Sequence, residues 1–197
     1  EQNKRKKSSQ SQKNASDKMK QMKKKMEEMQ TSMEMTMMQE NLDHLRDIVD
    51  NLVKVSFDQE KILTDFKGVN QSDPRYVTLS QEQLKLKDDA KIIEDSLLSL
   101  ASRVFQIQSF VTREVGAMND EIEASLQGLK DRRKSEATTH QQYAMTSINN
   151  LALLLDDVLQ QMQQQMAESM GKPKKGKGEK QNNPGLSDLQ KQLNQKI

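Results

Sequence analysis

Apolar residues recur at steps of three and four along most of this chain. The longest regular series passes through thirteen positions: Leu86, Ala90, Ile93, Leu97, Leu100, Val104, Ile107, Val111, Val115, Met118, Ile122, Leu126 and Leu129. Such spacing returns to one face of an α-helix, whereas a half-buried strand alternates every two residues. The chain is therefore predicted to form long helices that each bury one narrow face.

The residues available for a core support the same interpretation. Hydrophobic residues make up 33% of the 197 positions and aromatic residues 3%, too few to fill a wide globular core. The chain contains only 7 Gly and 3 Pro, which weaken or end helices, and it is rich in strong helix formers. We predict an all-α fold, an elongated antiparallel helical bundle with coiled-coil-like seams.

Turn signals divide the bundle, residues 16–170, into three long helices. Their predicted bounds are about 17–66, 79–132 and 136–169. Gly68 suits a left-handed cap at the end of the first helix. Ser80 and Gln83 are predicted to form a capping box that begins the second helix.

The second predicted helix contains signals of irregularity. Gly116, Gly128 and several serines weaken it, so we predict a kink or break near Ser102–Ser109. The basic cluster Lys130–Lys134 suits the carbonyl end of a helix and predicts a turn there.

The two ends differ from the predicted bundle. Residues 1–15 are basic and aperiodic, which predicts a flexible leader or a frayed helix end. Residues 171–185 are rich in Lys, Gly and Pro, typical of a disordered linker, and residues 186–197 begin a further amphipathic helix. Because the chain begins with Glu and stops inside that repeat, we expect it to be a segment of a longer protein.

Charge is distributed unevenly although the total is only +2. Residues 1–26 carry a net +8, residues 27–170 a net −11 and residues 171–197 a net +5. The basic ends could attract phosphate backbones or anionic lipid headgroups, or could be solubilising tails. Because aromatic residues for base stacking are missing there, we favour tails and predict no specific nucleic-acid partner.

Residues that could carry chemistry do not form a recognisable constellation. His44 and His140 lack the paired Glu-x-x-His pattern of bundle metal sites, and we expect structural or solvent roles for both. Adjacent acids such as Asp88 and Asp89 point about 100° apart on a helix and do not converge. The chain has no Cys. We predict no enzyme activity, no cofactor and no metal site.

The longest unbroken apolar run, Leu151–Leu155, is far below the ~20 residues that a membrane span needs. We therefore predict no membrane span within this segment.

Methionines are concentrated at the start of the first predicted helix. The candidate partner-binding residues at helical spacing are Met19, Met22, Met26, Met29, Met33 and Met37. Regular spacing favours ordinary packing against another helix, either within this segment or outside it, and the stripe is predicted to continue into Leu42 and Leu45. Adaptable thioethers could instead form a docking surface, and copper(I) capture is a third, weaker interpretation because no His or Cys is interleaved.

Two stretches resemble a known protein family. They are SRVFQIQSFVTREVGAMNDEIEASLQ (Ser102–Gln127) and QQYAMTSINNLALLLDDVLQQMQQQM (Gln141–Met166). They resemble the helical, Gln- and Met-rich C-terminal region of a large, membrane-anchored Bacteroidota envelope protein family of unassigned function, over most of residues 16–197. The resemblance implies a membrane-anchored parent with this segment on the periplasmic side, although the residues themselves also allow a cytoplasmic location. It supplies no catalytic residues.

These observations lead to three functional hypotheses. The first is a non-catalytic structural and scaffolding segment of a cell-envelope protein, which contacts other parts of its parent chain, envelope proteins or a second copy of itself. The second is an adaptor or chaperone-like module that binds apolar client segments through residues 19–38. A nucleic-acid binder comes third.

Overall fold

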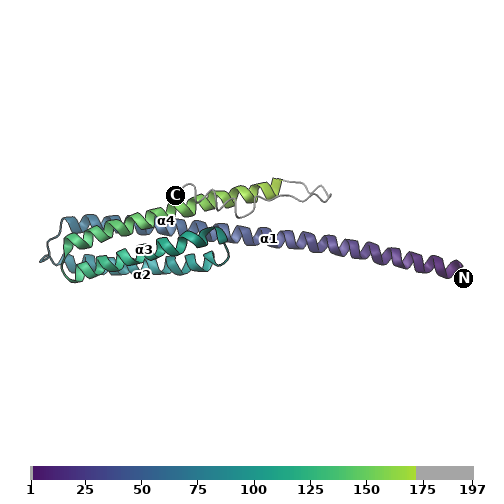
Figure 1. Ribbon diagram of the computed structural model, residues 1–197, viewed down its shortest axis with the longest axis horizontal. Helices are drawn as coiled ribbons and strands as arrows, with labels where there is room; N and C mark the ends of the chain where they lie inside the picture. The colour runs from purple at the N-terminus through teal and green to yellow at the C-terminus, as the bar shows by residue number, and fades with distance from the viewer. Residues whose placement is uncertain (1, 172–197) are drawn as a thin grey trace. The chain divides into compact units, whose positions relative to one another are not determined.

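The computed structural model describes residues 2–171, with the side chains of residues 10–170, and no strand occurs in that range. Its helices are α1 (Gln2–Lys67), α2 (Arg75–Ala101), α3 (Phe105–Lys130) and α4 (Lys134–Gly171) (Figure 1). The predicted all-α fold is confirmed. The predicted number of three helices was wrong, because the second predicted helix is divided into α2 and α3. The predicted linker from residue 172 and the helix at 186–197 lie outside the described residues.

The chain divides into two units, Glu1–Glu40 and Asn41–Ile197. The first unit is part of α1 and is helical from Gln2 onward. The sequence predicts a flexible leader or a frayed helix end for residues 1–15, and the structure places residues 2–15 in α1. This stretch contains neither Gly nor Pro, and its Lys, Arg, Gln and Ala residues are good helix formers.

In the second unit, the C-terminal part of α1 packs with α2, α3 and α4 as a bundle (Figure 1). Each helix contributes fully buried side chains to one contiguous core, for example Leu45, Leu97, Ile107 and Leu155. Each connection is short, which returns a helix alongside its predecessor. α3 contacts both α2 and α4.

The break between α2 and α3 lies at Ser102–Val104, inside the predicted region. Backbone N–H groups of Arg103 and Val104 both donate to the carbonyl of Leu100, at 2.9 and 2.8 Å. The Ser102 hydroxyl donates to Ser99 O at 2.7 Å. Val104 is extended (φ −112°, ψ 93°), which ends the helical path without a Gly or Pro.

The connection between α1 and α2 differs from its predicted form. Gly68 does not adopt a positive φ, so the left-handed cap was wrong. α2 begins at Arg75 rather than near residue 79, because Asp73 Oδ1 accepts the Arg75 N–H at 2.9 Å and Pro74 already has helical angles. The predicted capping box is also wrong: Ser80 Oγ donates to Tyr76 O at 2.8 Å inside the helix, and Gln83 is buried.

The turn between α3 and α4 is a Schellman motif at the predicted basic cluster. Arg133 N donates to Gly128 O at 2.7 Å and Arg132 N donates to Leu129 O at 3.1 Å. Arg132 occupies the left-handed position with φ 57°, where glycine is usual. Its guanidinium lies over the Tyr76 ring, 5.4 Å from the centroid, and donates to the backbone oxygen of Gln71. These contacts offset the strain of the turn.

Two glycines of α3 have opposite surroundings. A Cβ added at Gly128 would lie 3.0 Å from the Ala137 Cβ and 3.1 Å from its backbone nitrogen, whereas nothing lies within 4 Å of one at Gly116. Gly128 therefore allows the start of α4 to approach the end of α3.

We expect Gly128→Ala to destabilise the bundle and Gly116→Ala to stabilise it. Alanine gains up to about 1 kcal/mol of helix propensity at either site, but overpacking at Gly128 costs about 1–3 kcal/mol. The melting temperature should fall by roughly 2–6 °C in the first variant and rise by roughly 2–4 °C in the second. Thermal unfolding followed by circular dichroism checks this, and equal shifts in the two variants would contradict the close approach.

Candidate protein-interaction surface

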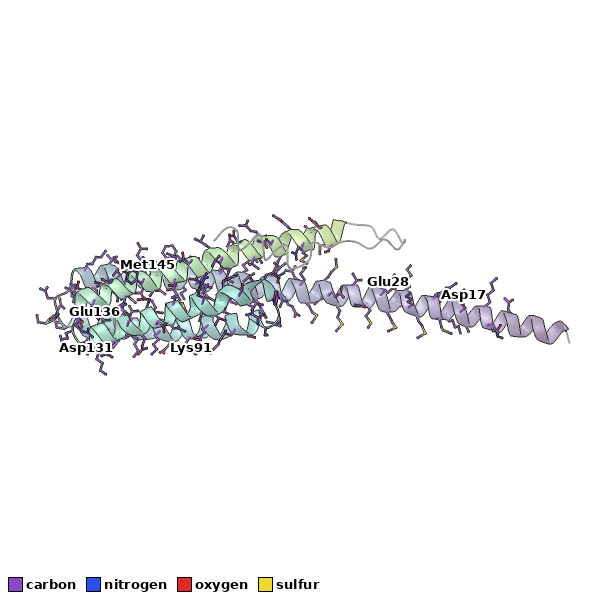
Figure 2. All side chains as sticks on the ribbon, viewed as in Figure 1. Asp17, Glu28, Lys91, Asp131, Glu136 and Met145 are labelled. Carbon is purple, nitrogen blue, oxygen red and sulfur yellow. The ribbon has the colours of Figure 1, made fainter. Side chains whose placement is uncertain are left out.

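The six methionines singled out in the sequence lie exposed along α1. Their exposed fractions range from 59% to 68%, and we call Met19, Met22, Met26, Met29, Met33 and Met37 the methionine row. Figure 2 shows sulfur atoms along the stretch of α1 labelled at Asp17 and Glu28. The row is an exposed apolar ridge, so no helix in the described part of the chain packs over it, and packing against a helix outside that part stays a prediction.

Side chains outside the row stabilise this part of the helix. Lys23 Nζ lies 3.9 Å from Glu27 Oε1, and Lys24 Nζ lies 3.7 Å from Glu28 Oε1. Such exposed i, i+4 ion pairs contribute about 0.2–0.5 kcal/mol each. Because the local helix is supported by polar side chains, the methionines are available for other contacts.

The methionine row does not continue into the buried face of the second unit. The three-four spacing ends at a step of one residue, from Met37 to Met38. Beyond that step, Leu42, Leu45 and Leu52 are buried. The prediction of one continuous buried stripe was wrong, because the sequence changes phase between the row and the core.

The second unit has a buried polar layer that the sequence interpretation missed. Gln59 on α1, Gln83 on α2 and Gln141 on α4 are each fully buried, and we call them the glutamine layer. Gln59 and Gln83 exchange hydrogen bonds at 2.9 and 2.8 Å, and Gln141 Nε2 donates to Gln83 Oε1 at 2.8 Å. Gln83 therefore connects three helices, while Gln141 Oε1 has no hydrogen-bond partner. Ser125 is the fully buried polar residue of α3.

At one end of the bundle, polar side chains donate hydrogen bonds to backbone carbonyl groups at the ends of helices. Lys134 Nζ donates to Val69 O at 2.7 Å and Lys67 O at 3.1 Å, at the carbonyl end of α1. The Tyr76 hydroxyl donates to Leu129 O at 3.1 Å. Burial raises the pKa of Tyr76, and the nearby Arg132 charge partly opposes that rise. A cation at a helix C-terminus is favourable, so Lys134 holds the start of α4 at the end of α1, and Tyr76 holds the start of α2 at the end of α3.

The two histidines and the paired acids make structural contacts. His44 Nδ1 lies 3.2 Å from the Arg103 guanidinium, and His140 Nδ1 lies 2.6 Å from Glu121 Oε2. Glu94 and Asp95, an adjacent acid pair, both contact Lys91, at 3.0 and 3.3 Å. These hydrogen bonds and ion pairs raise the pKa of Lys91. The histidine contacts join segments far apart in the sequence, and Glu94 and Asp95 both contact one lysine of their own helix.

The described residues contain no group of three or more His, Cys, Asp or Glu residues placed to hold a metal ion. None of the described helices is long and apolar enough to cross a membrane. Comparison with protein-family models, with curated proteins and with solved structures finds no match to this chain.

Proposed function

We propose that this chain is a non-catalytic structural and protein-interaction segment of a larger cell-envelope protein, on the periplasmic side of a membrane-anchored parent. Its interaction surface is the methionine row. Its bundle, residues 41–170, is the structural part. The family resemblance of Ser102–Gln127 and Gln141–Met166 is the basis for the envelope location.

The observation that carries this proposal is the exposure of six methionines at helical spacing. Thioether side chains are flexible and polarisable, so a row of them contacts apolar partners of varied shape. An exposed apolar ridge of this kind loses water-accessible surface when another polypeptide covers it. The amides of Gln59 and Gln83 and the amide nitrogen of Gln141 form hydrogen bonds between helices, which supports a structural role for that unit.

Photo-crosslinking in the producing cells tests this function. A photoreactive amino acid replaces Met22 or Met29, and the matched control replaces Lys24, whose side chain is 78% exposed and outside the row. We expect crosslinks to polypeptide from both row positions, in the envelope fraction, and none from position 24. Equal yields at all three positions, or recovery only of uncrosslinked protein, would refute the methionine row as an interaction surface.

An adaptor or chaperone-like role is the second candidate, favoured by the adaptability of the same thioethers. Such a module should keep a denatured client protein from aggregating, and replacing Met22, Met26 and Met29 with Glu should remove that effect. Light scattering of a diluted client distinguishes the two roles, because a scaffold segment with a fixed partner leaves client aggregation unchanged.

A further inference from the structure

We propose that the methionine row pairs with the same row of a second copy of this chain, with the two helices antiparallel. This inference rests on the proposed function, because it names the partner of the same surface. Two observations support the inference: the width and spacing of the row, and the distribution of charge on either side of its centre.

The row has the geometry of a seam between two helices. Met19, Met22, Met26, Met29 and Met33 follow steps of three, four, three and four, two positions in every seven residues. A globular helix buries a broader face, whereas a stripe of this width fits the seam of a coiled coil. The occupant that matches the stripe is therefore one other helix with the same repeat.

Charge along the same stretch selects the direction of pairing. Residues 15–26 contain five Lys and one Asp, and residues 27–40 contain four Glu with no Lys, Arg or Asp, so the halves carry +4 and −4. Parallel copies would place like charges together. Antiparallel copies related by an axis between Glu27 and Glu28 place each basic half against an acidic half, which favours association.

The flanking residues select the register within the antiparallel arrangement. With that axis, Met26 faces Met29 of the second copy and Met22 faces Met33. Lys23 is then flanked by Gln30 of the second copy. A shift of one heptad would pair Met22 with Met26 and bring each Lys23 against its equivalent. The centred register avoids that repulsion.

Disulfide trapping tests direction and register together, because the chain contains no Cys. Full-length Met26→Cys protein is mixed with full-length Met29→Cys protein and oxidised. We expect a disulfide-linked dimer of twice 22.6 kDa. We expect that dimer to be lost when Met26→Cys is oxidised alone and when it is mixed with Met22→Cys, since disulfides form only across a short Cα separation.

A matched pair of charge variants gives an independent test. Met22→Glu and Gln21→Glu introduce the same carboxylate at adjacent positions, on and off the row. Sedimentation should show concentration-dependent dimers for the wild type and for Gln21→Glu, and monomers for Met22→Glu. Circular dichroism should show equal helix content in all three, which separates lost pairing from lost folding.

The outcomes separate this inference from the proposed function. A dimer from Met26→Cys alone would overturn the antiparallel direction, and a dimer from the Met22→Cys mixture would overturn the register. Monomers throughout, with photo-crosslinks to other polypeptides still formed at positions 22 and 29, would overturn self-pairing and leave the proposed function standing. Monomers without any such crosslinks would overturn both.

Discussion

Replacing Ile107 with Asp should strongly destabilise the bundle. Ile107 is fully buried in the first turn of α3, directly after the break at Ser102–Val104. An unpaired carboxylate at such a site costs several kcal/mol, a large part of the roughly 5–15 kcal/mol that stabilises a typical domain. A loss of about 4–5 kcal/mol would lower the melting temperature by roughly 8–20 °C. Thermal unfolding followed by circular dichroism measures it.

The control for this variant is Gln108→Asp, at the exposed neighbouring position. Gln106, the neighbour on the other side, is half-buried, so Gln108 is the cleaner comparison. Leu100→Asp, on the other side of the break, should behave like Ile107→Asp, because Leu100 is 1% exposed. Similar midpoints for Ile107→Asp and Gln108→Asp would mean that the assignment of the buried face is wrong.

The α2–α3 break explains why periodicity predicted three helices instead of four. Leu100, Val104 and Ile107 are all buried, and they keep the four-three spacing across the turn. A three-residue turn formed by serine and backbone hydrogen bonds can preserve that spacing while reversing the chain. The helical class follows from periodicity, but a reversal of this kind depends on tertiary packing.

Periodicity also failed to separate buried from exposed positions at two sites. The methionine row has the spacing of a seam but is exposed. This exposure could not be predicted, because spacing alone does not reveal whether a partner covers a helix face. Conversely, each residue of the glutamine layer occupies a seam position: four residues after a buried apolar residue and three before the next. Gln59 lies between Val55 and Ile62 in this way. This spacing could have identified the buried glutamines from the sequence. Because Gln is abundant throughout the chain, these three residues did not stand out.

Replacing a single residue of the glutamine layer should lower the free energy of unfolding much more than replacing all three residues together. In Gln83→Leu, Gln59 loses the partners of its amide nitrogen and oxygen, and Gln141 loses the acceptor of its amide nitrogen. Each buried group left without a hydrogen bond costs about 1–3 kcal/mol. We expect the free energy of unfolding, measured with urea, to fall by at least about 3 kcal/mol. For Gln81→Leu, at an exposed position, it should change by less than about 0.5 kcal/mol.

Replacing Gln59, Gln83 and Gln141 together with Leu should restore most or all of that stability. The triple variant leaves no amide of the layer without a partner, and it also removes the unpaired Gln141 Oε1, so apolar packing replaces a network that was not fully satisfied. The polar layer would then contribute to the choice of helix register more than to stability, as a buried polar residue does in coiled coils. Sedimentation should accordingly reveal additional oligomers in the triple variant. If instead the triple variant is less stable than Gln83→Leu and forms no oligomers beyond those of the wild type, the layer stabilises the bundle directly, and its role in register selection is refuted.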